Sequence, residues 1–362
     1  MILVHGKKLN NDAQEQIIDR LGEDIVNTLN SNQTIDAQMV IDACDVLLTK
    51  VLGHQFDDIL MPLLEGIDIN YDMFLKHANL FSKESLTKKV KTELGALVSK
   101  EQPLDDNNVV IRHPLGVLLH IAAGNVDGLP AYSVVEGLLA GNINLLKLPS
   151  GDQGLSILLL EELIKIEPRL TDFIYVFDVP STELESIKKL ATYSDAVIVW
   201  GGDAAVKAAR DFADIKTKII AWGHKLSFAY CDLSVDDESL KSLATSICQT
   251  NQLLCSSVQG IYIDTASKDE QLAFAKRFFN IFKEVSMQMK PAPLGMRGKN
   301  SISLYNEMLE RGHQTGIFHE DGVSVVTYDD SELALSFLYR NVWIKRLPSQ
   351  NIISVFEDNR DD

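Results

Sequence analysis

The sequence predicts an α/β protein with two domains, the first built on a parallel sheet and the second a smaller α/β domain. Three observations support this fold class. From about residue 108 onward, strand-length apolar runs alternate with helix-length runs; residues 1–100 carry only helix-type periodicity; and 362 residues exceed what one hydrophobic core normally holds. A second alternation begins near Asp232. We therefore place the domains at 1–231 and 232–362.

The N-terminal part of the first domain is expected to be helical. Apolar side chains recur there every three or four residues, which places them on one face of a helix. The stretches with this spacing are 13–29, 34–52 and 82–98. None of them suggests a catalytic residue.

The sheet of the first domain is expected to follow. Its predicted strands are VLLHI, INLLKL, FIYVF, AVIVW and KIIAW, with helix-type runs between them. Nearly every residue in these strands is apolar, which is typical of parallel strands covered by helices on both faces. Because such sheets bind ligands at the carboxyl ends of their strands, the turns after these strands are the places to look for functional residues.

The second domain is expected to continue the alternation. A helix, a strand and a long helix fill 236–287, and the Pro- and Gly-rich stretch 290–300 predicts a surface loop. A strand near 323, a short helix from Ser331 and a strand at 341–347 complete the pattern.

Composition argues against several classes of protein. A net charge of −17 disfavours nucleic-acid binding and a basic membrane-surface helix, which both need clustered cations. No apolar run approaches the ~18 residues of a membrane span, and the N-terminus lacks the pattern of a secretion signal. Four cysteines without a C-x-x-C pair or zinc spacing indicate a reduced, cytoplasmic protein with no metal site.

Three strand-end turns carry candidate binding residues. Gly201 and Gly202 would let the backbone approach an anion at the start of the next helix, although a tight turn needs the same residues. Lys147 ends a strand and is either a ribose or phosphate ligand or a solvated lysine. Asn125 either donates to a developing oxyanion or caps the following helix. The G-x-G-x-x-G fingerprint of dinucleotide-binding proteins is absent from the chain.

The stretch ICQTNQLLCSSVQG carries two cysteines of different character. Cys248 lies in a helix-type run and is expected to be a buried core residue. Cys255 follows the break at Asn251 and Gln252 and is flanked by hydroxyl and amide groups, so it is better placed to react. From spacing alone it is either a nucleophile or a packing residue. No histidine forms a clear dyad with it, and His224, in a turn between two strands, is the one to examine.

In their order along the chain, these turns resemble the aldehyde dehydrogenase superfamily and, within it, the LuxC-type fatty acyl-CoA reductase family. The resemblance covers about 105–350 and rests on the motifs AAGNVDGLP, LLAGNINLLKLPS, VWGGDAAV, AWGHKLSFAY and NQLLCSS. It implies an aldehyde-dehydrogenase-like fold in which 1–231 binds the cofactor and 232–362 is the catalytic domain with the Cys loop.

The resemblance also implies a reaction, the reduction of a fatty acyl-CoA thioester to the aldehyde. In that scheme Cys255 attacks the thioester and a nicotinamide hydride reduces the acyl-cysteine. Asn125 and the backbone N–H of Cys255 would form the oxyanion hole, and His224 would help to protonate the aldehyde oxygen.

For the cofactor, the resemblance implies binding at the strand-end turns. Lys147 would hold the adenine ribose, and Gly201 and Gly202 would face the pyrophosphate. Ser150 and Gly223, in the same set of turns, are also expected to bind the cofactor. The acid that directly follows the serine in the family's K-P-S-E motif is replaced here by Gly151, which would not repel a 2′-phosphate, so NADPH is expected, with NADH as the alternative.

Two departures from the family pattern qualify this interpretation. Ala221 stands where hydrolytic aldehyde dehydrogenases carry a glutamate base, which disfavours attack by water. The family chain normally continues beyond the NVWIKRL strand, so the last part of the catalytic domain is expected to be missing.

The expected acyl donor is fatty acyl-CoA or an acyl-protein, and a homo-oligomer is expected, with no nucleic-acid or membrane partner. The alternatives are an aldehyde dehydrogenase or another acyl reductase on the same fold, and a shortened, non-catalytic cofactor-binding homologue.

Overall fold

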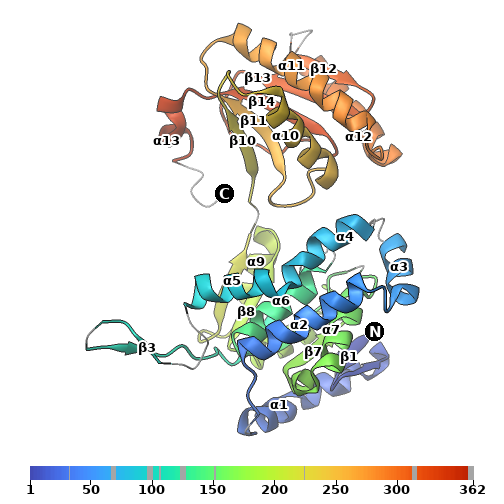
Figure 1. Cartoon of the computed structure of the whole chain (residues 1–362), viewed down its shortest axis with the longest axis vertical. Helices are drawn as coiled ribbons and strands as arrows, with labels where there is room; N and C mark the ends of the chain where they lie inside the picture. The colour runs from blue at the N-terminus through green and yellow to red at the C-terminus, as the bar shows by residue number, and fades with distance from the viewer. Residues whose placement is uncertain are drawn as a thin grey trace. The chain divides into compact units, whose positions relative to one another are not determined.

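A computed structural model of the chain describes residues 1–31, 33–66, 71–95, 101–105, 107–122, 128–150, 152–223, 225–311 and 316–357. The chain divides into two units, Met1–Gly223 and His224–Asp362, which are described here one at a time (Figure 1). Each unit has a main sheet and its own hydrophobic core.

Seven strands form the sheet of the first unit. They are β1 (Ile2–Val4), β2 (Lys7–Leu9), β5 (Val117–Ile121), β6 (Ile143–Lys147), β7 (Ile174–Phe177), β8 (Ala196–Trp200) and β9 (Lys218–Trp222). The order is β2-β1-β7-β6-β5-β8-β9, and the five strands from β7 to β9 in this order are parallel. The order reverses between β5 and β8, which is the switch point where doubly wound sheets bind their ligands.

Helices cover this sheet. They are α1 (Gln14–Asn30), α2 (Ala37–Leu52), α3 (Asp57–Gly66), α4 (Tyr71–Ala78), α5 (Lys83–Leu94), α6 (Leu129–Leu139), α7 (Leu155–Ile166), α8 (Leu184–Thr192) and α9 (Asp203–Phe212), with 3₁₀ turns at Asn11–Ala13, Asn79–Phe81 and Pro168–Phe173. The helix α2 packs on α6 and α7, α1 packs against α8, and α9 lies against β8 and β9. A short hairpin, β3 (Gln102–Pro103) with β4 (Val109–Val110), leaves the body of the unit (Figure 1).

The second unit has a five-stranded sheet in the order β10-β11-β14-β13-β12. Its elements are β10 (Ser227–Cys231), α10 (Asp237–Thr250), β11 (Val258–Ile263), α11 (Lys268–Met287), α12 (Leu294–Arg311), β12 (Ile317–Glu320), β13 (Val323–Tyr328), β14 (Asn341–Arg346), a 3₁₀ turn at Ser349–Asn351 and α13 (Ile352–Val355). All strands except β12 run parallel to their neighbours, and the apolar face of α11 packs on β13, β14 and α10.

The predicted α/β fold is confirmed, and the division between the units has a structural explanation. The chain divides after Gly223 instead of at Asp232, because β10 pairs with β11 and so belongs to the second sheet. An apolar strand at the start of a new sheet has the same composition as one at the end of the old sheet.

Three local predictions were wrong. The first residues form the β1–β2 hairpin, which pairs with β7, instead of helix. The predicted loop 290–300 becomes helix from Leu294, after two prolines that end at Pro293. No helix begins at Ser331: residues 331–337 have no regular secondary structure, and three successive left-handed residues, 338–340, follow directly before β14.

Candidate active site

The turn after β8 has the geometry of an anion-binding helix start. Gly201 and Gly202 follow Trp200, and Gly202 is the N-cap of α9 with no side-chain cap bond. A Cβ on Gly201 would approach the Cβ of Ala205 at 3.1 Å, so the turn is tight. Because α9 begins directly after β8, the free N–H groups of its first turn lie at the carboxyl edge of the sheet, and the Gly202 N-cap has no side chain to cover them.

Lys147 ends β6 at the same edge and is almost fully buried, with 4% of its surface exposed. Burial lowers the pKa of its ammonium group, and the nearby Asp178 carboxylate opposes that shift. No hydrogen-bond partner for its ammonium group is found in the described part of the chain. Ser150, three residues on, is exposed in the turn before α7.

Two tryptophans that the sequence analysis did not single out lie at this edge. Trp200 and Trp222 end the neighbouring strands β8 and β9, and their rings stack with centroids 5.2 Å apart. Trp200 Nε1 donates to Ser133 Oγ at 3.1 Å, and Ser133 Oγ lies 2.7 Å from His120 Nδ1. A buried polar chain thus fixes the Trp200 ring on the α6 side of the sheet.

Two predicted residues, Asn125 and His224, lie outside the described residues. Two others that were predicted beside them are described. Ala221 is exposed near the end of β9, and Gly223 follows that strand; no described atom lies within 4 Å of the point where a Cβ on Gly223 would stand.

Cys255 is exposed, in contrast to Cys248, which is buried in α10 as predicted. The Cys loop, residues 251–257, connects α10 to β11 and lies at the amino end of β11. It contains a tight turn in which Ser257 N donates to Leu254 O at 2.9 Å. Ser227 Oγ of β10 donates to the carbonyl oxygen of Cys255 at 2.8 Å. The loop thus presents its thiol outward from a hydrogen-bonded turn.

Two buried glutamine side chains bond to the backbone in and next to the Cys loop. Gln252 is 2% exposed, and its side-chain amide makes four hydrogen bonds, all to backbone groups. Gln259 Nε2 donates to Gln252 O at 3.2 Å and to Ser257 O at 3.1 Å. Sequence reasoning missed both, since a glutamine next to a polar loop is usually solvated.

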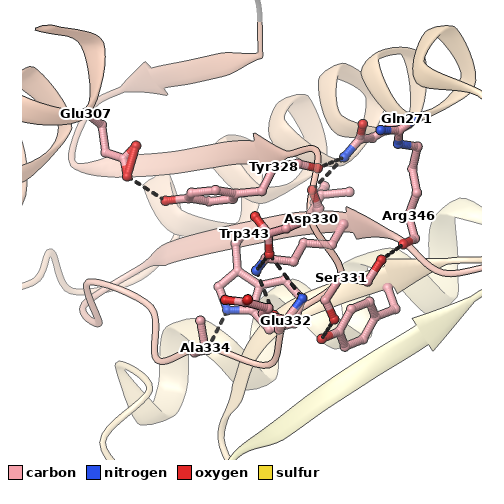
Figure 2. A network of polar contacts seen from close by, with 12 residues as sticks. Gln271, Glu307, Tyr328, Asp330, Ser331, Glu332, Ala334, Trp343 and Arg346 are labelled. Carbon is pink, nitrogen blue, oxygen red and sulfur yellow. Dashed lines mark hydrogen bonds and ion pairs between the residues drawn. The ribbon is translucent and has the colours of Figure 1, made fainter. Parts of the chain in front are cut away.

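A second polar network lies at the opposite, carboxyl edge of this sheet (Figure 2). Lys345 is buried between the rings of Tyr328 and Trp343 and pairs with Asp330. Trp343 Nε1 donates to Ala334 O at 2.7 Å. Since the charge of Lys345 is matched by a carboxylate, we interpret this network as structural.

The described ranges contain no group of three or more His, Cys, Asp or Glu side chains that could hold a metal ion. Among the helices described, none has both the length and the apolar character needed to cross a membrane.

Solved structures of low sequence identity share the fold. A methylmalonate-semialdehyde dehydrogenase from Sinorhizobium meliloti, solved with NAD, superposes with a TM-score of 0.71 at 11% identity, over 98% of this chain and 81% of that one. An aldehyde dehydrogenase from Bartonella henselae gives 0.68 at 12% identity, over 94% and 75%. These matches confirm the aldehyde-dehydrogenase-like fold.

Curated relatives are similar over part of their length. The long-chain acyl-protein thioester reductase of Vibrio harveyi is 27% identical over 216 residues, 58% of this chain and 45% of the relative. That of Photorhabdus laumondii is 30% identical over 188 residues, 51% and 39%. The chain thus matches about half the length of these relatives or less.

The sequence model of the family described as acyl-CoA reductase (LuxC) matches residues 37–361, and this span includes the Cys loop and every strand-end turn described above. The chain therefore belongs to the LuxC family of acyl-CoA reductases.

Proposed function

We propose that this protein reduces a long-chain acyl thioester to the aldehyde, through an acyl-cysteine at Cys255 and with NADPH as reductant. The observation that carries the proposal is the exposed thiol of Cys255 on a loop fixed by buried amides. The names of the relatives, acyl-protein thioester reductases, support the reaction class.

In the proposed reaction one sulfur atom, Sγ of Cys255, carries the acyl group from the donor to the point of reduction. Cys255 Sγ would attack the thioester carbonyl carbon, and the carbonyl oxygen would take the negative charge. When this adduct collapses, the bond to the donor sulfur breaks and the donor leaves as a thiol, with the proton that Cys255 lost. When bound, the nicotinamide supplies the hydride that reduces the acyl carbon. Release of the aldehyde would then leave Cys255 as a thiolate, and one proton from the solvent returns it to the thiol.

The negative oxygen needs hydrogen-bond donors. In the described part of the chain, no acceptor takes the backbone N–H of Cys255, so that group is free to donate. We assign the second donor to Asn125 and the protonation of the aldehyde oxygen to His224, as the family resemblance implies. Loss of one such donor typically lowers kcat about 10²–10³-fold.

The residues at the carboxyl edge of the first sheet fit a dinucleotide. The buried Lys147 would offer its charge to the ribose or its phosphate, and Ser150 follows three residues later in the same turn. Gly201 and Gly202 open α9 toward a pyrophosphate. NADPH is proposed over NADH because Gly151, and not a carboxylate, directly follows Ser150, and a comparison of kcat/KM for the two cofactors tests that choice.

The product should be aldehyde instead of acid. Ala221 offers no base that could activate water at the end of β9. The acyl-cysteine should therefore persist until it meets hydride or a thiol.

Mass spectrometry after brief mixing with a thioester, without reductant, tests the proposal. We expect a gain of one acyl group, mapped to the peptide that contains Cys255, from a long-chain acyl-CoA or from the same acyl group on a protein thiol. Acylation by the acyl-CoA would agree with the family's description as acyl-CoA reductase, and acylation by the acyl-protein would agree with the relatives' names. Addition of NADPH should then release free aldehyde.

Cys255→Ala should abolish the acyl adduct, and Cys248→Ala is the matched control because its thiol is buried in α10. The control should be acylated like the wild type. An adduct that persists in Cys255→Ala, or acid as the product, would contradict the proposal.

A further inference from the structure

The Cys loop has an unusual backbone at its start. Asn251 and Gln252 both have left-handed conformations, with φ of 45° and 63°, although neither is glycine. Asn251 ends α10 in this conformation, and Gln252 turns the chain down into the unit. Residues other than glycine rarely adopt these angles in succession, so surrounding contacts must hold them there.

The segment before β14 has the same property. Leu338, Tyr339 and Arg340 have φ of 62°, 48° and 71°. The two left-handed segments bond to each other: Tyr339 N donates to Asn251 O at 3.0 Å, and Arg340 N donates to the side-chain oxygen of Gln252 at 3.1 Å. Two strained segments far apart in sequence therefore hold each other in place.

The amide of Gln252 is the centre of this contact. Its Oε1 accepts from the N–H groups of Arg340 and Asn341, and its Nε2 donates to Asn341 O at 2.8 Å and Val258 O at 3.0 Å. Every hydrogen-bonding position of a buried amide is thus used, and all of them go to backbone. Gln252, near the start of the Cys loop, thus links the residue after the loop, Val258, to the start of β14 at Asn341.

Arg340 fixes the other side of the contact. Its guanidinium is buried and donates to Ser286 Oγ at 2.7 Å, to Lys290 O and to Asn251 Oδ1 at 3.4 Å. In the described residues no carboxylate lies within ion-pair distance of it, which is unusual for a buried arginine. Its charge is instead satisfied by carbonyl and hydroxyl oxygens at the end of α11 and by the first residue of the Cys loop.

We propose that Gln252 and Arg340 are positioning residues that hold the loop of Cys255 in the conformation needed for attack on the thioester. The inference rests on the proposed function for the role of Cys255. Neither residue is a catalytic residue, because both act through the backbone of the loop. A thiol that is displaced by about 1 Å can lose about 10²-fold in rate.

Gln252→Ala tests the proposal, and Gln271→Ala is its matched control. Gln271 is an equally buried amide of the same unit, with Nε2 donating to Tyr328 O at 2.8 Å and Ile344 O at 2.9 Å, but at the opposite edge of the sheet (Figure 2). Both variants lose buried hydrogen bonds to backbone, so both should lower the melting temperature. Only Gln252→Ala should change the chemistry of the Cys loop.

The first readout is single-turnover acylation of Cys255 at saturating thioester, per folded molecule. We expect Gln252→Ala to be about 10²-fold slower than the wild type, with Gln271→Ala within about twofold. Alkylation of the exposed thiol by iodoacetamide should change by less than about threefold in both, because it requires only access. Arg340→Lys, which keeps the charge but not the planar fork, should also slow acylation.

Wild-type acylation rates in Gln252→Ala, or equal losses in Gln252→Ala and Gln271→Ala, would overturn the proposal. Hydrogen exchange of the peptide 250–258 separates this failure from a failure of the proposed function. If the wild type forms no acyl-enzyme, the proposed function is wrong. Faster exchange in Gln252→Ala than in Gln271→Ala would then still support the loop-holding role, and equal exchange would end it.

Discussion

Protonation of His120 should destabilise the first unit in mild acid. The ring is fully buried, with Nδ1 2.7 Å from Ser133 Oγ and Nε2 3.0 Å from Asn144 Oδ1. Asn144 donates through its Nδ2 to the carbonyl oxygens of Asn142 and Phe173, so its Oδ1 is the acceptor and His120 Nε2 carries the proton. The neutral imidazole satisfies both contacts, and a second proton would be buried away from water.

The size of the effect follows from the pKa. Burial lowers the pKa of His120 from 6.5 to about 4, and the hydrogen bond to Asn144 partly opposes this. Because the folded-state pKa lies below the unfolded value, the unfolded chain takes up the proton first as the pH falls. The stabilising contribution is therefore complete above pH ~6.5 and is lost between ~6.5 and ~4. The full loss is about 3 kcal/mol, of which about 2 kcal/mol is already lost at pH ~5.

Urea unfolding followed by tryptophan fluorescence measures this loss. In a Trp343→Phe background the remaining tryptophans, Trp200 and Trp222, both lie in the first unit. The matched variant is His120→Gln, whose amide does not titrate. It should be less stable than the background near neutral pH, because its hydrogen bonds fit less well, yet lose about 2 kcal/mol less between pH ~7.5 and ~5. The same pH dependence in both proteins would refute the reasoning.

Two further predictions concern packing in the second unit. Gly260→Ala should destabilise it by about 1–3 kcal/mol, because the new Cβ would lie 1.8 Å from Trp343 Cδ2. Gly298→Ala, in a helix with no described atom within 4 Å of the new Cβ, should stabilise it by about 0.5–1 kcal/mol, and thermal melts that rank the two variants the other way would contradict this. Lys345→Ala should lower the free energy of unfolding by about 1–3 kcal/mol, since it leaves the carbonyl oxygen of Glu332 without its donor; unchanged urea unfolding would show that the buried lysine contributes nothing.

Most of the first sheet could be predicted because its strands are short, apolar and separated by helices. The strand-end rule then led directly to Lys147, Gly201 and Gly202, which the structure places at one edge. The β1–β2 hairpin could not be predicted, because strands of three residues carry too little pattern and their partner, β7, lies far along the chain.

The polar residues beneath the Cys loop could not be predicted either. Gln252 and Gln259 are embedded in a polar stretch whose composition is that of a solvated loop. Their partners, Ser336 and Arg340, lie 77 and 88 residues later, in and next to a segment predicted to be helical. Only the tertiary contact shows that 251–252 and 338–340 bond to each other through buried amides. Only the backbone angles show that both segments are left-handed.

Each unit has its own mostly parallel sheet, and the candidate site residues lie at its carboxyl edge in the first unit and at its amino edge in the second. In the first unit the candidate ligands lie at the carboxyl ends of the strands, where helix N-termini favour anions. In the second unit Cys255 lies at the amino end of β11, and the carboxyl edge is occupied by the network around Lys345. The Cys loop follows the C-terminal end of α10, and the contacts that hold it in the described residues come from the side-chain amides of Gln252 and Gln259. Substitutions around Lys345 should consequently lower the free energy of unfolding with little effect on the acylation rate. Substitutions of Gln252 should lower the acylation rate far more than their loss of stability alone would explain.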